Sequence, residues 1–181
     1  RYPGSWTSSE DAENGVREAV ELVNQFYERS RALLKLVVVF CRTQVSDHYF
    51  VVKRGGANYP PEWKRSNMVD VFFVHDFEKV GVAGRAKPPM FGETITIPAL
   101  DDVKGGGTLV RCPGEFARSL AHELGHYLGI HHPSANDSKS NIMYHDGLGH
   151  KLSQRNLRPD QIEDMHTTLS KNIARKADRD E

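Results

Sequence analysis

The stretch HELGHYLGIHH, residues 122–132, is rich in histidine, and its spacing determines how the chain must fold around it. His122 and His126 are four residues apart, so on a helix both rings project from one face and can reach one ion. Gly129 is typical of a helix end, because glycine accepts the left-handed conformation that turns the chain. After such a turn, His132 can come back toward the same ion. We therefore predict His122, His126 and His132 as metal ligands.

The number and type of these ligands indicate a catalytic zinc ion rather than a structural one. Three neutral imidazoles leave one position of a tetrahedral zinc ion open, whereas structural sites usually close with four protein ligands. Glu123 is not needed for coordination and is placed to take a proton from a zinc-activated water as general base. His131 comes one position before His132 and is predicted to be a bystander.

A methionine follows these histidines at a defined distance. The segment SNIMY, residues 140–144, places Met143 eleven residues after His132. Together with the pattern H-E-x-x-H-x-x-G-x-x-H, this resembles the metzincin clan of zinc endopeptidases, in which a methionine turn lies beneath the zinc without binding it. The resemblance implies a metalloprotease that hydrolyses internal peptide bonds of protein or peptide substrates. It leaves the subfamily open.

One position departs from the family pattern. Some metzincins use a tyrosine two residues after the turn methionine to stabilise the oxyanion. Here that position is His145, and Tyr144 follows Met143 directly. Tyr144 and His145 are both candidates for an oxyanion or auxiliary role, and plain packing is the alternative for each.

The flanking patterns predict an α/β (α+β) fold. Helices are expected over 9–31, capped by Ser8, over 114–129, and from Pro159 onward. Buried or half-buried strands are expected over 36–45, 50–53, 69–74 and 93–99. The resemblance implies a twisted mixed sheet with an antiparallel edge strand, together with an N-terminal helix, a zinc-binding helix, a methionine turn and a C-terminal helix. It also implies a single catalytic domain over 1–181, with an N-terminal lobe of about 1–129 and a small C-terminal lobe of about 130–181.

The segment ETITIPA, residues 93–99, is predicted to be the edge strand. It alternates polar and apolar residues, as half-exposed strands do, and Pro98 suits an edge position. An extended substrate main chain would pair with it by strand addition, as the family resemblance implies. The predicted contact residues are Glu93, Thr94, Ile95, Thr96 and Ile97.

Charge and composition argue against a nucleic-acid-binding or a membrane-spanning protein. The 181 residues contain 24 lysines and arginines against 24 aspartates and glutamates, so no overall field attracts nucleic acid. No apolar run approaches the roughly 20 residues of a membrane span. We expect a monomer, with a pro-segment or inhibitor as a further partner. Because the first residue is Arg1, we expect a processed or excised segment of a longer product. The family resemblance and the absent start methionine predict a secreted protein, and the resemblance implies a zymogen.

Two further features receive no functional prediction. Cys41 and Cys112 form one disulfide or remain two thiols, and the sequence does not decide between them. RCPGE around Cys112 faintly resembles the cysteine switch of matrix metalloproteases, but a disulfide or buried thiol is the preferred interpretation. Calcium has no support beyond Asp101 and Asp102 in an expected loop, and such pairs usually face water.

Two alternative functions use the same residues. A catalytically silent binding module would grip extended peptides, but it has no need of the general base Glu123. An amidase or deformylase-like hydrolase would share the zinc chemistry, but such enzymes usually lack the glycine, third histidine and methionine turn together. The sequence therefore favours the endopeptidase.

Overall fold

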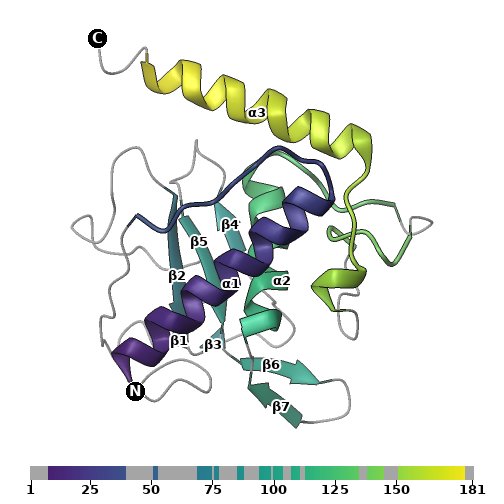
Figure 1. Cartoon of the computed structure of the whole chain (residues 1–181). Coiled ribbons are helices and arrows are strands. Elements are labelled where there is room, and N and C mark those ends of the chain that lie inside the picture. Colours follow the sequence, from purple (N-terminus) through teal and green to yellow (C-terminus); the bar gives the residue numbers. More distant parts are fainter. Residues whose placement is uncertain are drawn as a thin grey trace.

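The computed structural model describes residues 8–39, 51–52, 69–74, 76–77, 85–87, 94–98, 100–103, 107–110, 113–134, 138–144 and 151–177. Within these ranges the fold combines helices with short strands, as predicted for a mixed α and β protein (Figure 1). The elements in chain order are α1 Ser9–Arg29, β1 Val51–Val52, β2 Asp70–Val74, β3 Asp76–Phe77, β4 Arg85–Lys87, β5 Thr94–Pro98, β6 Leu100–Val103, β7 Gly107–Val110, α2 Pro113–Tyr127, the 3-10 helix η4 Leu152–Gln154 and α3 Pro159–Ala177.

Helix α1 starts where its capping residue predicts. The Asp11 backbone N–H donates to the Ser8 hydroxyl over 3.0 Å, which satisfies one of the orphan donors of the first turn. One side of α1 packs against α2, and the Tyr27 hydroxyl donates to the Ala121 carbonyl over 3.4 Å. Burial raises the pKa of Tyr27 far above its usual range. Helix α1 thus supports α2 from one side.

The prediction that residues 93–99 form an edge strand is wrong. Strand β5 lies in the middle of a three-stranded sheet of order β2-β5-β4. It runs parallel to β2, with Val71 opposite Ile95, and antiparallel to β4, with Ala86 opposite Ile95. Among the described residues, the antiparallel outer strand is therefore β4, and the sheet is mixed as predicted.

The wrong prediction of β5 as an edge strand has a physical cause. Thr94 and Thr96 are buried, as are Ile95 and Ile97, so both faces of the strand are covered. A threonine is β-branched and its hydroxyl can hydrogen-bond in a buried position, so it suits a central strand as well as an exposed face. Alternation of threonine with isoleucine therefore does not indicate a solvent-facing side.

The segment predicted as a buried strand over 36–45 also differs. Residues 36–39 are outside any strand, Val37 and Val39 are exposed, and residues 40–45 lie outside the described ranges. The Asn24 side chain accepts from the Leu36 N–H over 2.7 Å and donates to the Leu36 carbonyl over 3.0 Å. A side-chain amide therefore takes the hydrogen bonds that a neighbouring strand would offer.

Asp101 and Asp102 lie in a strand rather than in the expected loop. They belong to β6, which pairs antiparallel with β7, with Asp101 opposite Leu109 and Asp102 opposite Thr108. Strand β1 falls inside the predicted range 50–53 and pairs in parallel with β3. These two pairs are separate from the three-stranded sheet.

Helix α2 packs against both helix α1 and the three-stranded sheet. Its apolar residues Phe116, Leu120 and Leu124 are buried, as is Leu128 just after it, and the helix contacts α1, β4 and β5. Figure 1 shows α2 next to the β4 side of the sheet, with α1 crossing in front and α3 along the top of the view. Among the described residues, none of the helices combines the length and apolar character needed to cross a membrane.

Candidate metal centre

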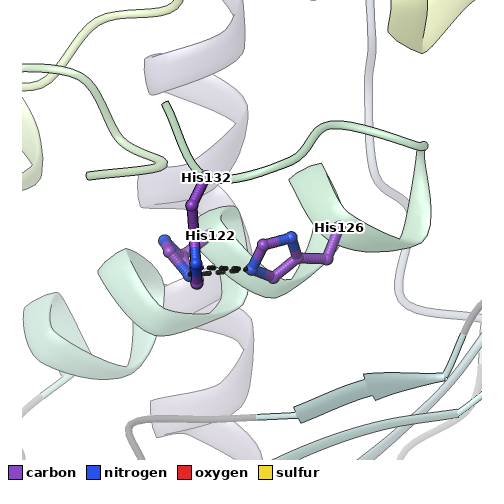
Figure 2. Close-up of side chains that lie close together, drawn as sticks. All are labelled: His122, His126 and His132. Carbon is purple, nitrogen blue, oxygen red and sulfur yellow. Dashed lines mark hydrogen bonds between the residues drawn. The ribbon is translucent and has the colours of Figure 1, made fainter. Parts of the chain in front are cut away.

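Three histidine rings converge on one point at the end of α2. His122 and His126 project from the helix, and His132 reaches them from the segment that follows it (Figure 2). The three Nε2 atoms are 2.9–3.2 Å apart. Nitrogens bound to a tetrahedral zinc ion at 2.0–2.1 Å would be about 3.3–3.4 Å apart, so the arrangement fits one metal ion. His131 is outside the group and exposed.

The backbone fixes which nitrogen of each helical histidine faces the centre. Nδ1 of His122 lies 2.8 Å from the Ile142 carbonyl, and Nδ1 of His126 lies 2.9 Å from the Ile130 carbonyl. A carbonyl oxygen can only accept, so each Nδ1 carries the hydrogen. In a neutral ring the Nε2 atom then carries the lone pair and cannot donate. Two such lone pairs 3.1 Å apart repel each other unless a cation lies between them.

The turn that brings His132 back is a Schellman motif. The Ile130 N–H donates to the Gly125 carbonyl over 2.9 Å, and the Gly129 N–H donates to the His126 carbonyl over 3.0 Å. Gly129 has φ +90°, in the left-handed region predicted for it. A Cβ there would lie 2.6 Å from the Thr168 hydroxyl of α3. Both the backbone conformation and the limited space therefore favour glycine at this position.

The methionine lies directly beneath the metal-binding helix. Met143 is completely buried, and a Cβ on Gly125 would overlap its sulfur. Gly125 stands between the ligands His122 and His126 in the sequence. A side chain at this position would therefore require the buried Met143 side chain to shift.

Burial and a neighbouring charge affect the second ligand. Burial lowers the pKa of His126, the hydrogen bond to the Ile130 carbonyl opposes this shift, and the charge of His131 reinforces it. A lowered pKa keeps the ring neutral, which is the form that binds a metal. His131 thus influences the site without being a ligand.

The other predicted site residues have different positions. Glu123 is 5 % exposed on α2, between the two helical ligands. Tyr144 is half-buried, and its N–H donates to the Asn141 carbonyl over 3.1 Å. Thr94 to Ile97 lie in the central strand β5. Glu93, His145, Cys41 and Cys112 lie outside the described residues.

The sequence reasoning missed two buried amides beside the methionine. Asn141 and Gln161 are 1 % and 2 % exposed, and the Asn141 Nδ2 donates to the Gln161 Oε1 over 2.8 Å. Arg155 supports the same segment by donating to the carbonyls of Lys139 and Asn141. The only available signal was an asparagine two residues before Met143, a spacing at which its side chain can accept from the methionine N–H.

Comparisons with known proteins add no family to this description. No protein-family model matches the chain, and a search of curated proteins finds no match. The site is therefore described by its own geometry: three histidines that could hold one metal ion, compatible with zinc, with a glutamate between the first two in the sequence.

Proposed function

We propose that the chain is a zinc-dependent endopeptidase of the metzincin type. The observation that carries the proposal is the convergence of three Nε2 atoms, from His122, His126 and His132, to within 2.9–3.2 Å of one another. The part of the chain that the structure describes offers three protein ligands, which matches the catalytic class of zinc sites. The family is proposed from the long histidine motif and from Met143 beneath it.

The proposed chemistry needs one further group from this chain. When bound, zinc supplies a Lewis acid for the substrate carbonyl and lowers the pKa of water from 15.7 to about 7. Glu123 accepts the proton of the attacking water and delivers it to the leaving amine. Its buried position beside His122 supports this role, because a carboxylate shielded from bulk solvent interacts more strongly with a nearby proton.

The position of the substrate is proposed from the sheet. Because β5 is central, an added strand would pair instead with β4, which has a partner on one side only among the described residues. Helix α2 contacts both β4 and β5, so β4 lies next to the helix that carries the ligands. A peptide paired with β4 would run extended past the metal centre.

The decisive experiment compares the wild-type chain with Glu123→Gln on a diverse peptide library read by mass spectrometry. The wild type should cleave internal bonds, stop after chelation and recover with added zinc. Glu123→Gln should retain zinc and lose about 10²–10⁴-fold in rate, the usual contribution of a general acid–base group. Zinc binding by both proteins without cleavage would identify a binding module. Near-normal cleavage by the variant would remove Glu123 from the mechanism.

A further inference from the structure

A single peptide group connects the methionine segment to the first metal ligand. The Ile142 carbonyl accepts from Nδ1 of His122 over 2.8 Å, and the Met143 N–H donates to the Asn141 Oδ1 over 2.9 Å. This carbonyl and this N–H belong to the same peptide bond. Because a peptide group is planar and rigid, an acceptor that fixes its N–H also fixes the direction of its carbonyl. Asn141 therefore controls the group that orients the His122 ring.

Asn141 is itself held by α3. Its Nδ2 donates to the Gln161 Oε1 over 2.8 Å, and the Gln161 Nε2 donates back to the Asn141 Oδ1 over 3.4 Å. We call these two side chains the amide clasp. Both are nearly inaccessible to water, so an amide deprived of its partner would remain unsatisfied.

Backbone donors determine the orientation of both amides. Asn141 must present its oxygen to the Met143 N–H, and Gln161 must present its oxygen to the Arg158 N–H over 3.0 Å. With both oxygens so placed, each NH₂ group faces the oxygen of the other residue. The clasp therefore has one orientation, which an aspartate or glutamate could not reproduce because it has no donor.

From this connection we infer that Asn141 and Gln161 are positioning residues for the metal centre, acting on His122 through the peptide bond between Ile142 and Met143. The inference rests on the metal-binding part of the proposed function. Removing a partner that orients a metal ligand typically lowers metal affinity by about 10–100-fold. The amide clasp should therefore influence the zinc affinity. Its Gln161 lies on α3, an element that carries none of the three histidines.

The first test measures zinc affinity by competition with a chromophoric chelator, using the full chain. Asn141→Ala and Gln161→Ala should each weaken zinc binding by about 10–100-fold and change the d–d spectrum of the cobalt-loaded protein. Asn156→Ala is the matched control. Its side chain is exposed, and its backbone keeps the hydrogen bonds to Ser140 and Ile142. Unchanged affinity and spectrum in both clasp variants would overturn the inference.

A double-variant cycle tests the route through His122. In a His132→Ala background, Asn141→Ala should still reduce the residual zinc affinity by about 10-fold or more, because His122 still needs orienting. In a His122→Ala background the same change should have almost no effect. Equal losses in both backgrounds would show general destabilisation and overturn the inference.

These measurements separate the clasp from the proposed protease. A wild-type chain that binds no zinc would overturn both proposals. A wild-type chain that binds zinc but cleaves no peptide would remove only the enzymatic function, and the cycle would still report on the clasp. Gln161→Ala also provides a second test if Asn141→Ala fails to fold, because Gln161 lies on another element.

Discussion

The positions of single residues decide which of the four histidines in the stretch 122–132 belong to the candidate metal centre. His131 and His132 are neighbours in the sequence, yet only His132 has its Nε2 within 2.9–3.2 Å of the other ligands. This distinction could be predicted from sequence, because helix periodicity and the glycine turn are local properties. The carbonyl partner of His122 could not, since Ile142 is 20 residues away in the sequence.

Substituting the two neighbouring histidines should therefore give unequal results. His132→Ala removes a direct ligand and should weaken zinc binding by more than the roughly 100-fold seen for partners outside the coordination sphere. His131→Ala is the matched control and should change the affinity by only a few-fold, since His131 is exposed and lies outside the histidine cluster. Competition with a chelator at pH 7.5 measures both. Similar losses in the two variants would contradict the assignment of ligands.

Elements differ in how far sequence predicts them. The starts of α1 and α3 and the turn after α2 follow from Ser8, Pro159 and Gly129, because capping and turn chemistry act within a few residues. The place of β5 in the sheet does not follow from its own residues. It depends on β2 and β4, which lie at other points of the chain, and β4 has only three residues. Short strands carry too little pattern to be recognised.

The contact between Gly125 and Met143 gives a prediction at the scale of packed elements. Gly125→Ala should lower the free energy of unfolding by about 1–3 kcal/mol, because the new methyl group overlaps a sulfur that is completely buried. In a Met143→Ala background the overlap disappears. There the same change should stabilise the helix by up to about 1 kcal/mol, since alanine has the higher helix propensity.

Urea unfolding of the metal-free proteins measures this difference, and the sign is the test. An equal loss in both backgrounds would mean that Gly125 is needed for a reason other than the space occupied by Met143. A stabilised single variant would mean that the methionine side chain moves aside without penalty.

At the scale of the whole molecule, the centre depends on segments far apart in the chain. Helix α1 supports α2 through Tyr27, the segment around Met143 packs beneath α2, and α3 holds that segment through Gln161. The histidine motif predicted the cluster of three rings but not this arrangement, because amides such as Asn141 and Gln161 have no spacing that marks them as partners. Their contact is defined only once α3 is packed.

Because the ligands and their supports belong to different elements, zinc should stabilise the whole fold. At a free zinc concentration 100 times the Kd, binding to the folded state alone contributes about 2.7 kcal/mol. For a chain of this size, each kcal/mol raises Tm by about 2–4 °C, so Tm should rise by roughly 5–11 °C. Differential scanning calorimetry with and without zinc measures the shift. His132→Ala at the same zinc concentration should show almost none, and an equal rise in that variant would place the stabilising zinc ion at another site.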